Sequence, residues 1–219
     1  MNCEIQTLMR EVRIAMDENA DWHDLLAAED TTLRLDDIII QKIVDATRML
    51  IEETPAEQLN NGRDFTELEI NWIGNHGQIR LPDDFLRLII FRMSDWDLPV
   101  RELQNDDTEL YAMQSSPIPG IAADHQRPLV FRTRIKGDDI LEFYGCKDQG
   151  ATIISAEYLP EPYIVDGIID VPSLIRMEVI YRAAGLTAMA IKDYTLSTNL
   201  IAVSNRKGEV APPEPAKEE

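Results

Sequence analysis

The sequence has few of the side chains that most often carry chemistry. Its 219 residues include two cysteines, Cys3 and Cys146, and three histidines, His23, His76 and His125. Two cysteines are too few for a disulfide framework and indicate a reducing compartment, with a single bridge between them as the alternative. The histidines have no partner at metal-site spacing, and HExxH and CxxC are absent, so we interpret each histidine as an ordinary loop residue.

Long apolar runs are also lacking. No stretch approaches the roughly 20 apolar residues that span a bilayer, and the stretch MNCEIQTLMREVRIAMDENADW carries charges throughout, unlike a signal peptide. The glycine-containing stretches GNHGQ and GDDILEFYG lack the spacing of a phosphate-binding loop. The sequence therefore predicts no membrane association and no cofactor.

Positive charge is in short supply as well. The chain has 21 lysines and arginines against 40 aspartates and glutamates, which gives a formal net charge of −19. Because phosphate binding needs lysine or arginine, such a surface repels nucleic acid. One interpretation of this charge is solubility, and the other is a surface that lies near DNA without adhering to it.

Apolar residues, at 44% of the chain, are plentiful enough for a hydrophobic core. In residues 4–17 and 33–54 they recur at the spacing of amphipathic helices, and Asp36 and Asp37 stand where a helix start favours negative charge. Residues 171–191 predict a last strong helix, which a shorter and less regular helix follows.

The stretch PDDFLRLIIFRM, residues 82–93, is interpreted as a buried central helix. Pro82 suits a first helical turn, and Asp83 and Asp84 follow it there. The rest is apolar nearly all round, which is typical of a helix inside a core. We expect this helix where a helical bundle meets a β portion, with SDWDLPV turning the chain out of the bundle.

Other segments predict strands and turns. Residues 66–73 and 77–81 read as two short strands joined by GNHG, and residues 105–116 as a short helix. Residues 129–146 predict a hairpin that turns at KGDD, and residues 151–160 predict a third strand. We interpret the last three strands as one antiparallel meander.

Together these segments predict an α+β fold: an antiparallel helical bundle with an inserted small antiparallel β portion and a disordered acidic C-terminal tail. The predicted parts are N-terminal bundle helices (1–64), a hairpin with the buried central helix and loops (65–128), the β meander (129–160), C-terminal bundle helices (161–206) and the disordered tail (207–219).

Four pairs of aspartates raise the question of a metal site. Three pairs are expected at helix starts and the fourth in a hairpin turn, so each has a local structural role. We therefore predict no metal and no catalytic residue, and we interpret Cys146, with Lys147 as its basic neighbour, as a small apolar side chain. The pairs are Asp36/Asp37, Asp83/Asp84, Asp106/Asp107 and Asp138/Asp139.

Several stretches in order along the chain resemble one protein family. LPDDFLRLIIFRMSDWDLPV, YAMQSSPIPGIAADHQRPLVF, ILEFYGC and VPSLIRMEVIYRAAGLTAM are similar to head-to-tail connectors of short-tailed phages. These are the tail tubular protein A or gatekeeper type, including ring proteins below the portal in crAss-like phages. The resemblance covers residues 80–190, and the helices at 4–17 and 33–54 share only its layout. The matching positions are Asp84–Leu88, Gln114, Arg127–Val130 and Leu141–Tyr144.

The resemblance implies a virion structural protein at the head–tail junction, made in the host cytoplasm and without enzyme activity. Its partners would be copies of itself in a ring, commonly of twelve, the portal protein above and adjacent tail or ring proteins. DNA would pass through the ring without sequence-specific binding.

Two stretches near the C-terminus are candidates for contacts between subunits. Residues 183–190 are small, which lets another helix approach closely, although packing inside the same chain is the alternative. The stretch NLIAVSNRK supplies the candidate interface residues Leu200, Ile201, Val203 and Arg206.

Two other functions compete with the connector hypothesis. An acidic regulatory or DNA-mimic protein would hold a nucleic-acid-binding partner by charge, and salt would weaken that complex strongly. A small hydrolase would use scattered carboxylates or Cys146, and it would lose its activity when Cys146 is replaced by serine.

Overall fold

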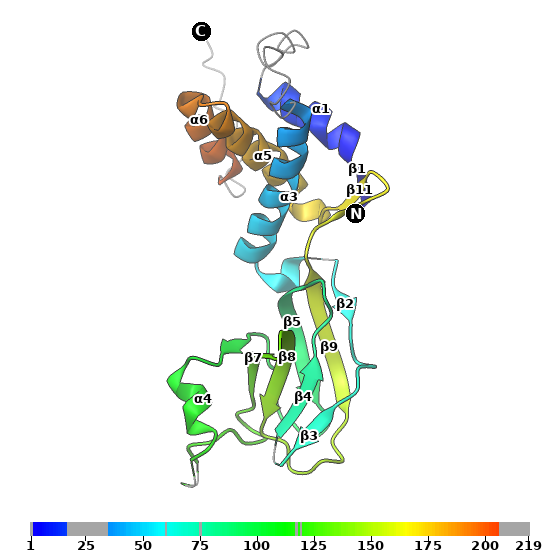
Figure 1. Cartoon of the computed structure of the whole chain (residues 1–219), viewed down its shortest axis with the longest axis vertical. Coiled ribbons are helices and arrows are strands. Elements are labelled where there is room, and N and C mark those ends of the chain that lie inside the picture. The colour runs from blue at the N-terminus through cyan, green and yellow to red at the C-terminus, as the bar shows by residue number, and fades with distance from the viewer. Residues whose placement is uncertain are drawn as a thin grey trace, which may run out of the picture. The chain divides into compact units, whose positions relative to one another are not determined.

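The computed structural model describes residues 2–16, 35–59, 61–74, 76–116, 118 and 120–205. The chain divides into two compact units (Figure 1). Met1–Glu53 and Pro162–Glu219 form the first, which we call the helical unit, and Thr54–Glu161 form the second, the β unit. The β unit is thus inserted between the two halves of the helical unit in sequence.

Helices build the helical unit, and the two in its N-terminal half are amphipathic. Ile5, Leu8 and Val12 of α1 are buried, as their spacing predicts, and the same holds for Ile39 and Ile43 of α3. The helices predicted at 4–17 and 33–54 are therefore found, with described bounds of Ile5–Ala15 and Leu35–Glu53. The helices are α1 (Ile5–Ala15), α3 (Leu35–Glu53), α5 (Arg176–Ala190) after the 3-10 turn η3 (Ser173–Ile175), and α6 (Tyr194–Ser204).

The small residues of α5 serve a contact inside the chain. A Cβ atom on Gly185 would lie 2.7 Å from Cγ1 of Ile201 and 3.3 Å from the carbonyl oxygen of Ser197, both in α6. Ala184 and Ala188 are fully buried. The stretch 183–190 thus brings α6 close to α5 within one subunit, which is the alternative left open by the sequence.

A small sheet completes the helical unit. Its strand order is β1-β11-β10, and both pairings are antiparallel. Asp166 and Gly167, with φ of 51° and 77°, form the tight turn between its last two strands in sequence. The strands are β1 (Asn2–Glu4), β10 (Ile164–Val165) and β11 (Ile168–Asp170).

Two sheets build the β unit. The first has the order β2-β9-β5 and the second the order β3-β4-β8-β7-β6, in which only the β6–β7 pair is parallel. A 3-10 turn, η2 (Ala56–Gln58), and a short helix, α4 (Glu109–Met113), lie outside the sheets. The strands are β2 (Arg63–Asp64), β3 (Asn71–Ile73), β4 (His76–Arg80), β5 (Phe85–Met93), β6 (Gln104–Asn105), β7 (Leu129–Ile135), β8 (Asp138–Tyr144) and β9 (Ile153–Pro160).

Aromatic rings join the two sheets into one core. Phe91 of β5, in the first sheet, lies 5.2 Å from Phe143 of β8, in the second, measured between ring centroids. Trp96 packs edge-on against both rings, and Phe65 stacks on Phe91 at 6.1 Å. Because these rings come from both sheets, the sheets pack face to face around them.

The predicted central helix at 82–93 is wrong, because this segment forms strand β5. Leu88 of β5 lies opposite Tyr158 of β9, and Phe91 lies opposite Ala156. The helix-start signals form a turn instead, closed by a hydrogen bond from the Phe85 N–H to the Pro82 carbonyl. An apolar run without a polar face fits a buried strand as well as a buried helix, and periodicity cannot separate the two.

The predicted meander is also wrong. The hairpin of β7 and β8 is confirmed, with positive φ at Lys136 and Gly137 in its two-residue turn. Strand β9, however, pairs with β5 and β2 in the other sheet. The predicted fold class, a helical bundle with a small β portion, is therefore incorrect, because strands in three sheets make up much of the described chain.

The remaining predictions have mixed outcomes. Of the two short strands joined by GNHG, the second is confirmed as β4 and the first is confined to Asn71–Ile73 of β3. The helix predicted at 105–116 is confined to Glu109–Met113. Arg206 and the predicted tail at 207–219 lie outside the described residues. Within the described part of the chain, no helix has the length and apolar character to cross a membrane.

Candidate functional site

The outer face of the five-stranded sheet carries the most unusual cluster of side chains in the β unit. Along β8, Leu141 and Phe143 point into the aromatic core, so Glu142 and Tyr144 point to the opposite face. Although it faces away from the core, Glu142 is only 3% exposed. Helix α4 lies beside this sheet (Figure 1), and its Tyr111 packs edge-on against Phe131 at 5.1 Å.

Three side chains surround the buried carboxylate of Glu142. The Tyr144 hydroxyl donates a hydrogen bond to Oε1, and the Tyr111 hydroxyl donates to Oε2 over 3.3 Å. Nε2 of His76 lies 3.2 Å from Oε1, and the His76 ring stacks on Tyr144 at 4.8 Å. From the sequence we interpret His76 as a loop residue. In the structure His76 begins strand β4 and contacts the Glu142 carboxylate.

The network fixes the protonation of its two phenols. Burial raises the pKa of Tyr144 above its ordinary value, and the neighbouring Glu142 carboxylate raises it further. Burial and Glu142 raise the pKa of Tyr111 in the same way. Both hydroxyls therefore keep their protons and donate to Glu142. The arrangement ties α4 to the sheet through a carboxylate that strand β8 holds in place.

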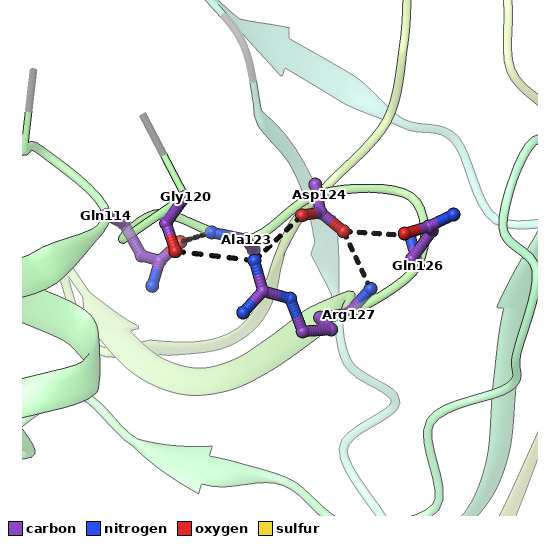
Figure 2. Close-up of polar contacts among 6 residues, drawn as sticks. All are labelled: Gln114, Gly120, Ala123, Asp124, Gln126 and Arg127. Atoms are coloured by element: carbon purple, nitrogen blue, oxygen red, sulfur yellow. Dashed lines mark hydrogen bonds and ion pairs between the residues drawn. The ribbon is translucent and has the colours of Figure 1, made fainter. Parts of the chain in front are cut away.

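A shallow pocket of ≈ 260 Å³ adjoins this network. One wall is formed by Gln114, whose amide nitrogen donates to the Leu110 carbonyl over 2.7 Å. Figure 2 shows its second bond, in which the amide oxygen accepts from the Ala123 N–H over 2.9 Å. Gln114 is buried although it is polar. Its two hydrogen bonds fasten the end of α4 to the loop that follows.

That loop is held by a second set of hydrogen bonds. The Asp124 carboxylate accepts from the backbone N–H groups of Gln126 and Arg127, both over 2.9 Å, and pairs with Nη2 of Arg127 over 3.0 Å (Figure 2). The same Nη2 donates to the Gly120 carbonyl over 3.3 Å. The connection between α4 and β7 is therefore braced at both of its ends.

Cys146 also lines the pocket, but its thiol is poorly suited to be a nucleophile. Burial raises the pKa of Cys146 to about 12, and the nearby Asp95 carboxylate acts in the same direction. Because the thiolate is the reactive form, little of it is present at neutral pH. This environment gives the hydrolase hypothesis no support.

We expect Cys146 in the folded protein to react with iodoacetamide at pH 8 at least about tenfold more slowly than in the urea-unfolded chain. Mass spectrometry of the peptide that contains Cys146 would measure both rates. The unfolded chain is the control, since the raised pKa depends on the fold. Equal rates in the two states would contradict the environment described here.

The carboxylates of the four aspartate pairs do not gather into a metal site. Among the described residues, no three His, Cys, Asp or Glu side chains lie close enough together to hold a metal ion. Several of these aspartates bind arginines instead: Asp36 pairs with Arg13, Asp84 with Arg63, Asp138 with Arg80, and Asp139 with Arg132 and Arg134.

The candidate interface residues near the C-terminus lie in different surroundings. Leu200 is buried, at 6% exposure, and Ile201 packs against Gly185 inside the helical unit. Val203 is 40% exposed, and Arg206 lies outside the described residues. Of the four, Val203 is therefore the described residue that offers the most surface to a partner.

Sequence reasoning missed the surface of α4. Its polar residues Tyr111 and Gln114 face the protein, whereas Leu110 and Met113 are 42% and 40% exposed. This is the reverse of an ordinary surface helix, which buries its apolar side. The sequence contains two interleaved pairs of residues at helical spacing, Tyr111/Gln114 and Leu110/Met113. No local pattern shows which of the two pairs faces the protein.

The comparisons with known proteins decide little. No protein family matches the sequence. No curated protein matches it closely enough to count as a relative. The likeness to phage connectors rests on short apolar motifs and stays a prediction. The function of this protein therefore has to be argued from the surfaces described above.

Proposed function

We propose that this protein is a structural subunit of a phage head-to-tail connector. It would form a ring of twelve copies of itself beneath a portal protein. The observation that carries the proposal is the reversed helix α4, which fixes Tyr111 and Gln114 inward and presents Leu110 and Met113 outward. An apolar surface held rigidly in this way favours a contact with another protein over a reaction with a substrate.

Further apolar side chains support a role in assembly. Ile118 and Ile121, in the braced loop after α4, are 58% and 41% exposed. The helical unit has its own set, with Leu174, Met177 and Tyr194 between 55% and 63% exposed. A ring needs two different complementary faces on each subunit. The exposed apolar residues of the two units are the candidates for such faces.

The charge of the chain suits a DNA conduit. A net charge of −19 leaves few lysines and arginines to hold phosphates. Many of the arginines in the β unit already pair with carboxylates, as Arg63, Arg80 and Arg132 do. DNA sliding past such a surface would not be retained, which fits passage without sequence-specific binding.

The proposal places the protein in the virion, at the head–tail junction, after synthesis in the host cytoplasm. Its partners there would be the portal protein and adjacent tail or ring proteins. The proposal gives it no enzymatic activity and no cofactor, and a membrane takes no part in it.

Mass measurement with the portal protein of the same phage tests this proposal. We expect light scattering to show monomers at low micromolar concentration, and a complex with several copies bound to each portal after mixing. Electron micrographs of that complex should show an added ring. A protein that stays monomeric beside portal at tens of micromolar would contradict the proposal.

Salt dependence separates this function from that of an acidic DNA mimic. Copies with a net charge of −19 repel each other, so raising the salt from about 20 mM to 150 mM should favour ring assembly by screening that repulsion. A complex that a DNA mimic forms by opposite charge would weaken over the same range. The sign of the salt effect therefore tells the two apart.

A further inference from the structure

Helix α6 covers one side of α5 over only part of its length. Met177, Tyr181 and Gly185 are spaced four residues apart, so they follow one line along α5, and Leu174 precedes them in η3. At Gly185 this line is covered, because a Cβ atom there would lie 2.7 Å from Cγ1 of Ile201 in α6. Further toward the start of the helix, Leu174 and Met177 are 58% and 55% exposed. We call Leu174, Met177 and Tyr181 the α5 stripe.

Helix α6 runs antiparallel to α5 and ends beside Arg182 (Figure 1). Near its start, the carbonyl oxygen of Ser197 lies against Gly185. At its end, Nε of Arg182 donates to the Ser204 hydroxyl over 2.9 Å, and Nη2 of Arg182 donates to Oδ1 of Asn205 over 2.6 Å. Contacts later in α6 thus fall earlier in α5. The end of α6 therefore points along α5 toward the α5 stripe.

The chain that follows Asn205 can reach the whole α5 stripe. It continues as RKGEVAPPEPAKEE, residues 206–219. At the rise of a helix, Leu174 lies about 12 Å from Arg182 along α5. A stretch of about five extended residues spans about 16 Å, so Val210 is within reach of Leu174.

We propose that residues 206–215 of the same chain, which we call the C-terminal segment, dock on the α5 stripe. Its apolar centre, VAPP at 210–213, would cover Leu174 and Met177. The inference does not rest on the proposed ring, since it concerns a single copy. A neighbour in that ring that contacted the same stripe would have to displace the C-terminal segment first.

The composition of the C-terminal segment suits this surface. Its two successive prolines favour the extended polyproline II conformation, which loses little backbone entropy on docking and packs on aromatic rings such as that of Tyr181. Arg206 and Lys207 come first in the segment and would meet Glu178, which lies beside Tyr181 on the same side of α5. Glu178 makes no ion pair with a described residue. A basic start and an apolar centre thus follow the order of the side chains along α5.

Attachment to the same chain explains how so small a surface can hold its partner. Three side chains offer less area than the roughly 800 Å² that each partner buries in a stable complex of separate proteins. A segment tethered at Asn205 is present at an effective concentration in the millimolar range, so a weak contact is still populated. The C-terminal segment therefore suits the α5 stripe better than a separate protein does.

Methionine oxidation tests the contact in the full-length protein. Met177 and Met189 are 55% and 46% exposed on the same helix, so without a cover hydrogen peroxide should oxidise them at similar rates. We expect Met177 to react at least about fivefold more slowly than Met189, because the C-terminal segment covers only Met177. Mass spectrometry of their separate tryptic peptides measures the two rates. Equal rates would overturn the proposal.

Two variants show whether the C-terminal segment is what covers Met177. Val210→Asp places a charge in the apolar centre, and it should bring the Met177 rate to within about twofold of the Met189 rate. Val210→Leu keeps an apolar side chain and should leave Met177 slow. Thermal unfolding of each variant checks that α5 stays folded. A Met177 that stays slow with Val210→Asp, or becomes equally fast with Val210→Leu, would rule the segment out as the cover.

Cross-linking separates the same chain from a second copy. With Leu174→Cys and Val210→Cys together, a mild oxidant should form a disulfide within one copy. The matched control combines Met189→Cys with Val210→Cys, since Met189 lies about 10 Å from Arg182 in the other direction along α5. Its bridge should form at least about tenfold more slowly, and the native cysteines are the same in both proteins. Equal rates, or bridges only between copies, would contradict docking within the chain.

Discussion

Replacing Phe91 with alanine is expected to lower the free energy of unfolding of the β unit by about 3–5 kcal/mol. Phe91 is fully buried, and its ring contacts Phe65, Trp96 and Phe143 from both sheets. Removing it leaves a cavity that rings held on two different sheets cannot collapse to fill. Urea unfolding followed by tryptophan fluorescence would measure the change, because the Trp96 indole lies 5.6 Å from the Phe91 ring.

Ile154→Ala in strand β9 is the matched control. Ile154 belongs to the same sheet but is 56% exposed, so its truncation should change the free energy of unfolding by less than about 0.5 kcal/mol. Similar losses for Phe91→Ala and Ile154→Ala would contradict a core that lies between the two sheets.

The helices of the helical unit were predictable because their signals are local. In α1 the buried residues Ile5, Leu8 and Val12 follow one stripe, and the intervening positions are mostly polar. In α3 the aspartates Asp36 and Asp37 add a start signal. Such patterns depend on the chain within a few turns, so the sequence contains everything needed to recognise them.

Strand β5 was not predictable in the same way. Its pairing partner β9 lies about seventy residues further along the chain, and Leu88 meets Tyr158 only in the folded sheet. The start signals Pro82 and Asp83 serve a turn as readily as a helix. Strand formation depends on packing with partners, and a one-sided local pattern was missing because both faces of β5 carry apolar residues.

The region around the β7–β8 hairpin likewise combines a local signal, which was predictable, with a long-range pairing, which was not. Its turn at Lys136 and Gly137 is a local signal and was predicted, since positive φ at two successive positions favours glycine. The choice of partner for β9 is a long-range property. Nearness in sequence favoured pairing with β8, whereas the structure places β9 between β5 and β2.

The candidate site was even harder to predict from the sequence than the pairing of the strands. Alternation in ILEFYG shows that Leu141 and Phe143 share a face opposite Glu142, but alternation alone predicts that Glu142 is exposed. Its burial requires Tyr111 of α4 and His76 of β4 to close over that face. These residues come from three separate segments, and no local pattern connects them.

The buried network and the exposed residues Leu110 and Met113 lie on two sides of one short helix. A helix of five residues is not stable alone in water, so contacts with the sheet must hold its shape. Tyr111 contacts the sheet and Gln114 fastens the helix to the loop after it, and the two together turn Leu110 and Met113 outward. In the proposed connector, the Glu142 carboxylate would therefore influence assembly from a distance, by fixing the surface that would meet a neighbour.

Replacing Glu142 with alanine is accordingly expected to lower the free energy of unfolding by about 3 kcal/mol. The substitution leaves the buried hydroxyl of Tyr144, the partly buried hydroxyl of Tyr111 and the ring nitrogen of His76 without the carboxylate that they contact. We also expect amide hydrogens of α4 to exchange at least about tenfold faster, because the helix loses its tie to β8. Urea unfolding and hydrogen exchange read by mass spectrometry measure the two effects.

Two further variants make this expectation specific. Tyr111→Phe removes one hydroxyl and keeps the ring against Phe131, so it should cost about 1 kcal/mol and speed exchange in α4 by less than the Glu142 variant does. Glu157→Ala, at an exposed position of β9, should leave exchange in α4 unchanged. If Glu142→Ala protein that remains folded shows wild-type exchange in α4, the carboxylate does not hold this helix. The link from the buried network to the exposed side of α4 would then be lost.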